Sequence, residues 1–276
     1  MGTSGAFGGS GGKDAKDLRD SIADWLDDQP PTGPGDGSPD GDGAAEGESP
    51  APDPNQARPD IDLRPALGIL LRPRGGGGGD GPGGGGGGAA GGGGGGSRSS
   101  GGAQRSVGSV SRSTGRAGRL ALAYSTGDRQ TLALAGLDYD QLRALRDPVE
   151  IGFRIIEAAF ETQPDSTIED SEAREIAASV VEWILEETTA PSPDEVVRKA
   201  IETIVVNVVL TEVGETIRSR GASQVERQAT ESAIRDAAEV WAQQVSLRAT
   251  GATDQQMSDA IESGIRELGE IFGVES

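Results

Sequence analysis

The sequence contains no cysteine and no histidine, and aromatic residues make up only 3% of it. Without them the chain has no disulfides, thiol nucleophiles, Ser–His triads, histidine bases or zinc sites built on cysteine and histidine. The lack of cysteine fits a reducing compartment, so we expect a cytoplasmic protein. No apolar run approaches the length of about 18 residues that a membrane span needs. The first residues also lack the apolar core of a secretory signal.

What the chain has in excess is glycine, proline and negative charge. It holds 45 glycines and 15 prolines, mostly in the first hundred residues, and its formal net charge is -20. We predict that residues 1–12 are a flexible Gly-rich tail and that residues 29–103 are a disordered Gly/Pro-rich linker, because such segments bury too little apolar surface to offset the loss of chain entropy. The negative charge repels nucleic acid and anionic lipid, so neither is an expected partner.

One apolar cluster interrupts this linker, at residues 61–72. Its large apolar side chains are concentrated in a short run that arginines flank on both sides: Leu67, Ile69, Leu70 and Leu71, with Arg64, Arg72 and Arg74. The cluster is either a short linear binding motif or a β or helical patch that folds back onto the domain.

Residues 104–276 show the apolar periodicity of α-helices, and we predict that they form a helical domain. The expected fold is all-α: a helical bundle of five to seven helices preceded by a long disordered Gly/Pro-rich arm. Capping residues mark the expected helix starts. These are Asp138, Asp147 followed by Pro148, Ser166 with Glu169, and Ser192 with Pro193 and Glu195.

The segment from Ser192 to about Arg220 has the clearest start signal and the most apolar residues, so we predict that it is the central helix. A strand at 204–210 is the alternative, because this stretch is rich in β-branched residues. Asn207 either faces solvent or sets the packing register of the helix. Two more helices are expected to bury Val225, Ile234, Trp241 and Val245 in one, and Met257, Ile261, Ile265, Leu268 and Phe272 in the other.

Residues 13–28 predict a short amphipathic helix with one apolar stripe, formed by Leu18, Ile22, Trp25 and Leu26. A helix of this length is only marginally stable alone, so it needs a surface to pack on. That surface belongs either to its own domain or to a partner. In the second case Trp25 is the residue expected to dominate the binding energy.

A strip of arginines runs from Arg98 to Arg119 with no acidic residue before Asp128. Arg105, Arg112, Arg116 and Arg119 share one face of a helix at spacings of 7, 4 and 3. The strip either contacts nucleic-acid phosphates or pairs with acidic residues of this protein or of a partner. The second interpretation is favoured, because no aromatic residues for base stacking lie between the arginines.

Paired carboxylates are frequent, as in Glu169 and Asp170, Glu186 and Glu187, or Asp194 and Glu195. Each pair lies at an expected helix start or on an expected solvent-facing surface, as is usual in so acidic a chain. No metal-ligand spacing and no nucleophile–base pair stands out. We therefore expect no enzyme activity, no cofactor and no metal.

The first 28 residues carry a distinctive pattern: Met1-Gly2-Thr3-Ser4, then Ala6 and Phe7, then Gly8-Gly9-Ser10-Gly11-Gly12, and finally Trp25 with Asp27-Asp28 behind it. This start resembles the QatB proteins of bacterial Qat anti-phage defence systems. The resemblance spans roughly residues 1–28 and 104–274. In the second part it is one of helix order and character. The sequence departs from the QatB pattern in two places: Ser10 stands where many relatives carry proline, and residues 29–103 are much longer than the middle segment of those relatives.

The resemblance implies a non-enzymatic subunit of a multi-gene defence system that includes an ATPase, a deazaguanine-synthase-like protein and a TatD-like nuclease. It further implies that Gly2 is modified on its amine by the deazaguanine-synthase-like partner after Met1 is removed. Thr3, Ser4 and Phe7, together with the apolar stripe of residues 13–28, are then expected to bind partners, the synthase-like protein and the ATPase. The alternative function is a nucleic-acid adaptor that uses the Arg98–Arg119 strip.

Overall fold

The computed structural model describes residues 12–28, 61–71, 107–160, 168–221, 223–247 and 253–274, with side chains of the fourth range from residue 171 onward. Within these residues the chain forms ten helices and no strand, so the all-α prediction is confirmed. The helices are α1 (Lys13–Asp27), α2 (Arg64–Leu71), α3 (Val107–Thr126), α4 (Arg129–Leu134), α5 (Tyr139–Leu145), α6 (Pro148–Phe160), α7 (Ile168–Glu186), α8 (Pro193–Arg220), α9 (Gln224–Gln244) and α10 (Asp254–Ile271). The predicted tail and most of the predicted disordered arm lie outside the described residues.

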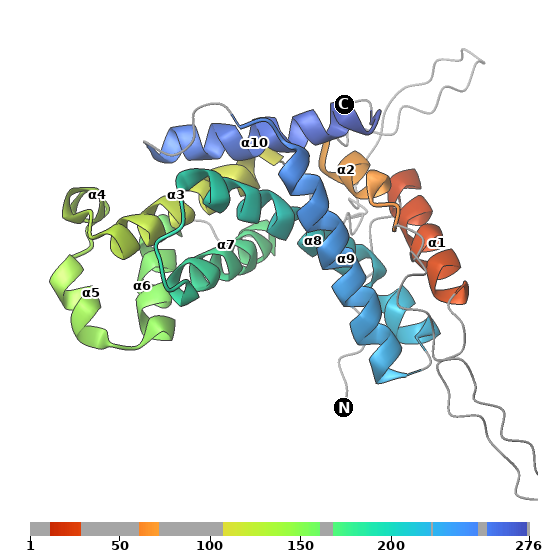
Figure 1. Cartoon of the computed structure of the whole chain (residues 1–276), viewed down its shortest axis with the longest axis horizontal. Helices are drawn as coiled ribbons and strands as arrows, with labels where there is room; N and C mark the ends of the chain where they lie inside the picture. Colours follow the sequence, from red (N-terminus) through yellow and green to blue (C-terminus); the bar gives the residue numbers. More distant parts are fainter. Residues whose placement is uncertain are drawn as a thin grey trace, which may run out of the picture.

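The helices fall into a central bundle with two distinct ends (Figure 1). Helix α3 packs on α6, α7 and α10, and α8 packs on α7, α9 and α10. Helices α1 and α2 lie at one end of the molecule, and the short helices α4 and α5 lie with α6 at the other end (Figure 1). None of the described helices has the length and apolarity to cross a membrane.

Helix α8 is the central helix, as the sequence predicts. It contacts α1, α2, α3, α7, α9 and α10. A capping box fixes its start: the Glu195 amide donates to Ser192 Oγ at 3.3 Å, and the Ser192 amide donates to Glu195 Oε2 at 2.6 Å. The β-branched stretch is helical throughout, so the strand alternative is wrong. Asn207 is half-buried, and its Oδ1 atom is enclosed without a hydrogen-bond partner among the described residues.

Helix α2 lies inside the range 29–103 that the sequence predicts to be one linker. The apolar cluster at 61–72 thus folds back onto the domain as a helix, one of the alternatives left open above. Leu63 and Leu67 are fully buried, and α2 contacts α1, α8 and α10. The segment is ordered because five of its eight helical residues are buried, four of them with apolar side chains, and three neighbouring helices cover them.

Small residues allow α3 and α10 to cross closely. A Cβ atom at Gly115 would lie 2.6 Å from Ser258 Oγ, 2.8 Å from the Ser258 amide nitrogen and 2.9 Å from its Cα. Two of these three atoms are backbone atoms, so a larger side chain at Gly115 would have to move α10 itself. This crossing ties the α3 helix, which leads into α4, to the C-terminal helix.

Two expectations need correction. The described helices outnumber the predicted five to seven, because α4 and α5 are separate short helices with their own caps and α2 belongs to the fold. Val225 was expected to be buried but is 68% exposed. It lies nine residues before the buried Ile234, which places it on the opposite side of α9.

Candidate functional site

The sequence-predicted site residues fall into two groups. Gly2, Thr3, Ser4 and Phe7 lie outside the described residues, and so do Arg98 and Arg105. The apolar stripe of α1 and the arginines of α3 lie within them. The apolar stripe lies on α1 and the arginines lie on α3, so the structure does not bring the stripe and the arginines together in one site.

The apolar stripe of α1 is buried against the protein itself. Leu18 and Ile22 have no exposed surface, Trp25 is 6% exposed, and Leu26 packs half-buried beside them. The neighbours of α1 are α2 and α8. These four residues were predicted to bind a partner, and this is corrected: their apolar surface is already covered by the domain, which leaves none of the stripe's core for another protein.

Two ion pairs set the direction of α1 along α8. Arg19 Nη1 donates to Glu212 Oε2 at 3.4 Å, and Arg220 Nη1 donates to Asp27 Oδ2 at 2.6 Å. Both pairs join residues 193 positions apart, so α1 runs parallel to the second half of α8. Glu212 is only 8% exposed, and the guanidinium of Arg19 supplies the opposite charge that a buried carboxylate requires.

The start of α1 lies against α2. A Cβ atom at Gly68 would approach Asp14 Cγ to 2.8 Å, so the two helices meet at the first turn of α1. From the parallel register, this turn lies beside the middle of α8 rather than at either of its ends. The Gly-rich segment before Gly12 is therefore joined to a defined point of the bundle. We call the surface that α2 and the second half of α8 offer to α1 the α1 seat.

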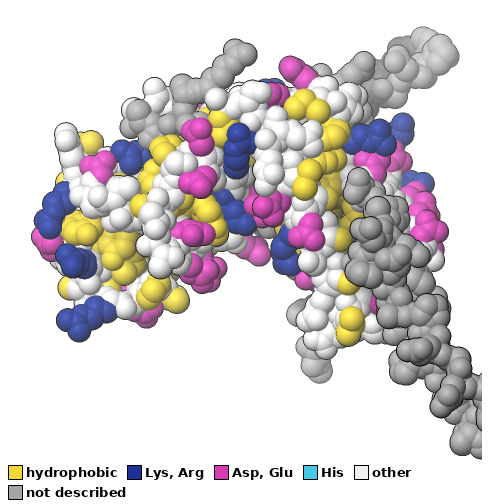
Figure 2. Space-filling model, in the orientation of Figure 1, with side chains coloured by type: hydrophobic (Ala, Val, Ile, Leu, Met, Phe, Trp, Pro, Cys, Tyr) yellow, Lys and Arg dark blue, Asp and Glu magenta, His cyan; other side chains and the backbone are white. Residues whose placement is uncertain are grey.

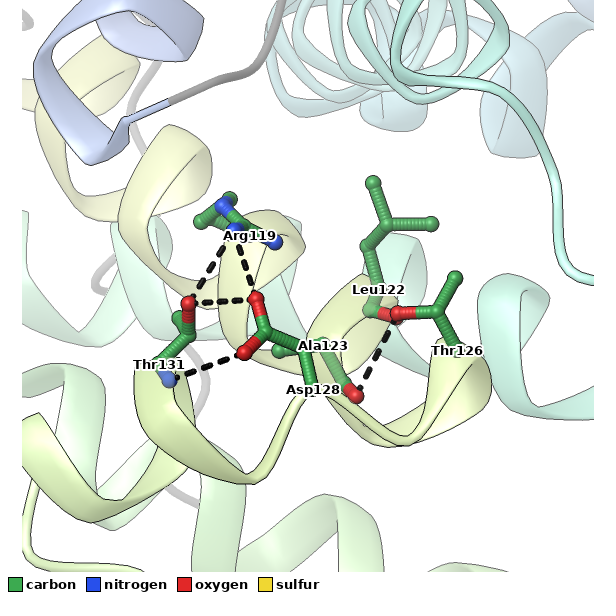
Figure 3. Close-up of polar contacts among 6 residues, drawn as sticks. All are labelled: Arg119, Leu122, Ala123, Thr126, Asp128 and Thr131. Carbon is green, nitrogen blue, oxygen red and sulfur yellow. Dashed lines mark hydrogen bonds and ion pairs between the residues drawn. The ribbon is translucent and has the colours of Figure 1, made fainter.

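The arginines of α3 share one face of the helix, but they differ in exposure and in their partners. Arg112 is exposed, and Arg116 and Arg119 are half-buried. Arg119 Nη2 donates to Asp128 Oδ2 and to Thr131 Oγ1, both at 3.0 Å (Figure 3). Arg119 was predicted as a nucleic-acid contact. In the structure it instead joins α3 to the start of α4, as the pairing alternative anticipates.

Asp128 is the centre of this junction. Its carboxylate accepts hydrogen bonds from the Thr131 amide at 3.1 Å and the Thr131 hydroxyl at 2.6 Å, which caps α4 (Figure 3). These two bonds, with a smaller effect from Arg119, lower the pKa of Asp128 from 3.8 to about 2. Thr126 closes the end of α3 by donating to Leu122 O at 2.8 Å, and Gly127 turns the chain with φ 74°. The arrangement therefore fixes the direction in which α4 leaves α3.

Among the carboxylate pairs, Glu195 has a structural role. Glu195 belongs to the capping box, and its hydrogen bonds from Ser192 lower its pKa. Glu186 and Glu187 are exposed at the end of α7. The described residues contain no group of three or more histidine, cysteine, aspartate or glutamate side chains placed to hold a metal ion.

No family model, no curated protein and no solved structure matches this chain. The α1 seat is thus defined by the geometry alone. The sequence predicted the stripe of α1 but missed that α2 forms half of its seat. The signal was present in the apolar run at 67–71, which is too concentrated for a solvated linker.

Proposed function

We propose that this protein is a non-enzymatic, cytoplasmic subunit of an anti-phage defence system resembling Qat, and that its N-terminal glycine tail is a substrate of a deazaguanine-synthase-like partner. The helical domain acts as the scaffold that holds the tail, and the ATPase of the same operon is a second partner. The support is the Met1–Gly12 pattern placed directly before a helix whose apolar stripe is buried in the α1 seat.

The chemistry of the tail fits this role. Removal of Met1 would leave the α-amine of Gly2, whose ordinary pKa of about 7.7–8.0 leaves a useful neutral fraction near pH 7. Glycine has no side chain that would hinder attack by this amine. N-myristoylation is the common alternative for Met-Gly starts, but position 6 is Ala6 rather than serine or threonine.

The α1 seat adds a geometric requirement. Once Met1 is removed, the ten residues before Gly12 span at most about 33–36 Å when fully extended. An active site that modifies Gly2 must therefore come within this distance of the first turn of α1. Because Leu18 and Ile22 are fully buried, the anchor stays on the domain while the tail is presented.

The test is mass spectrometry of the N-terminal peptide from cells with and without the other proteins of the operon. We expect loss of Met1 and an added mass on Gly2 only when the partners are present. Gly2→Pro, which makes the amine secondary and hindered, should abolish both the added mass and defence. Ser10→Pro changes the tail away from the amine and serves as the matched control that keeps both.

One result would contradict modification of Gly2. If Gly2 stays unmodified with all partners co-expressed, and if Gly2→Pro supports full defence, the tail is not a substrate. The domain would then be left with the scaffold role alone.

A further inference from the structure

The ends of α9 and α10 expose an apolar surface built around two aromatic rings. The rings of Trp241 and Phe272 are half-buried and stack with their centroids 4.0 Å apart and their planes at 21°. The residue before each ring is exposed: Val240 by 55% and Ile271 by 46%. We call these four residues the aromatic patch. Its surface can be covered by one further apolar or aromatic side chain.

The aromatic patch lies close to the point where the Gly-rich tail joins the fold. Gly68 of α2 meets Asp14 in the first turn of α1. Leu71, one turn further along α2, packs on Gly269 of α10 so closely that a Cβ atom there would overlap it. Because Gly269 precedes Phe272 by one turn, the start of α1 and the end of α10 lie on successive turns of α2. Figure 2 shows hydrophobic side chains gathered where α2 and the end of α10 meet.

The sequence offers one segment of its own that could cover the patch with a large apolar side chain. Among all residues outside the described ranges, valine, leucine, isoleucine, methionine and aromatic residues occur only as Met1 and Phe7. Phe7 stands five residues before Gly12 and so reaches about 17–18 Å from it when extended. The aromatic patch is within that reach, whereas α4 and α5 lie at the opposite end of the molecule (Figure 1).

Two physical effects favour Phe7 over a side chain of another molecule. A tether of five residues gives Phe7 an effective concentration of about millimolar order at the patch, well above that of a second copy in solution. Residues 1–11 also carry no charged side chain, whereas a second copy brings a further net charge of -20 and is repelled. We infer that the aromatic patch is the docking site of Phe7, which packs against Trp241 and Phe272 and holds the tail on the domain.

This inference goes beyond the proposed function and does not depend on modification of Gly2. Burial of one phenylalanine side chain favours the docked state by roughly tenfold to a hundredfold. The tail is therefore held on the domain but is released without unfolding α1. A partner that binds the tail at Phe7 has to displace it from the patch, so docking limits access to the tail.

The first test places the photo-crosslinking residue p-benzoylphenylalanine at position 7 of the full-length chain, where its ring stands in for that of Phe7. Irradiation followed by peptide mass spectrometry should give crosslinks within one chain to the peptides that hold the aromatic patch. The yield should fall several-fold on Val240→Asp with Ile271→Asp, because charged side chains beside the rings oppose an apolar contact. The matched control is Val149→Asp with Val225→Asp, two valines with 78% and 68% exposure, which should leave the yield unchanged.

A second test keeps the natural side chains of the patch and needs no crosslinker. Phe7→Ala should speed amide hydrogen exchange in residues 268–274 several-fold, because docking of Phe7 covers the last turn of α10 and reduces its local opening. Phe7→Trp should restore slow exchange, since it keeps an aromatic ring at this position. Thr3→Ala in the same tail is the matched control and should exchange like the parent. Circular dichroism of all variants shows whether the helices are kept.

Three outcomes would overturn the inference. Crosslinks could spread over several helices or fall mainly on α4–α6, or their yield could survive Val240→Asp with Ile271→Asp. Crosslinks between two chains that increase with protein concentration would assign the patch to a second copy. Equal exchange rates in Phe7→Ala and the parent would show that Phe7 does not cover the end of α10.

Discussion

Helices α1 and α6 show opposite relations between composition and burial. Helix α1 is mostly charged and has a single apolar stripe, yet Leu18 and Ile22 on that stripe are completely buried. Helix α6 is apolar on both sides. Ile151 and Ile155 face the core, while Val149 and Phe153 on the other side are exposed. The apolar stripe of the more charged helix is thus covered, whereas the more apolar helix exposes part of its apolar surface.

The comparison of α1 with α6 shows how much can be concluded from an apolar stripe. A stripe indicates that a helix needs a covering surface, but it carries no information on which protein supplies that surface. For α1 the cover is α2 and α8 of the same chain. For the outer side of α6 the described residues supply none. The two ends of the molecule therefore differ in packing: the apolar stripe of α1 is covered by its own chain, and the outer side of α6 is exposed among the described residues.

The largest expected effect separates these two ends directly. Leu18→Ala should lower the free energy of unfolding by about 2–5 kcal/mol, because it leaves a cavity in the α1 seat. Val149→Ala on the exposed side of α6 should change it by less than about 0.5 kcal/mol. Urea denaturation followed by circular dichroism measures both. An unchanged midpoint for Leu18→Ala would mean that α1 does not contribute to the fold and that its stripe is open to a partner.

A smaller effect is expected where α3 crosses α10. Gly115→Ala should destabilise the protein by about 1–3 kcal/mol, because the new methyl group would overlap backbone atoms of Ser258. Gly214→Ala on α8 is the matched control, since no atom lies within 4 Å of the added Cβ. Alanine should stabilise that helix by about 0.5–1 kcal/mol. Melting temperatures that shift in the same direction for both variants would contradict the close crossing.

The junction between α3 and α4 should respond to both mutation and acid. Asp128→Ala removes the cap of α4 and should cost about 1 kcal/mol. The pKa of Asp128 is about 2 in the folded protein and 3.8 ordinarily, so its contribution is complete above pH 3.8 and is lost as the pH falls through 2. Denaturation at pH 7 and at pH 2.5 should show a smaller difference between parent and variant at the lower pH. An equal difference at both values would exclude a role for the carboxylate charge.

The smallest effect concerns nucleic acid. Because Arg119 is engaged with Asp128 and the chain is strongly acidic, DNA binding should be weak and should disappear near physiological salt. Fluorescence anisotropy with a labelled duplex at several salt concentrations measures this. Tight, salt-tolerant binding that Arg112→Ala with Arg116→Ala abolishes would instead support the nucleic-acid adaptor.

Some of the fold follows from local chemistry and was predictable. The capping box at Ser192 and Glu195 forms as expected, because a cap depends only on residues within one turn. The apolar seam of α10 is buried through Met257, Ile261, Ile265 and Leu268, because its spacing is regular over the whole helix. The exposure of Val225 was missed, because Val225 lies on the side of α9 opposite to the buried Ile234.

By itself, the sequence determined the all-α fold, the central position of α8 and the amphipathic character of residues 13–28, since periodicity and caps are local properties of the chain. Only the tertiary structure decided where the apolar surfaces go. It placed the stripe of α1 in a seat built partly from α2, which begins 37 residues after the end of α1. In the tertiary structure Arg119 pairs with Asp128 at the start of α4, and the side chains of Val149 and Phe153 are exposed to solvent. The physical reason is that burial depends on neighbours brought together by long-range packing, and periodicity within one helix carries no record of those neighbours.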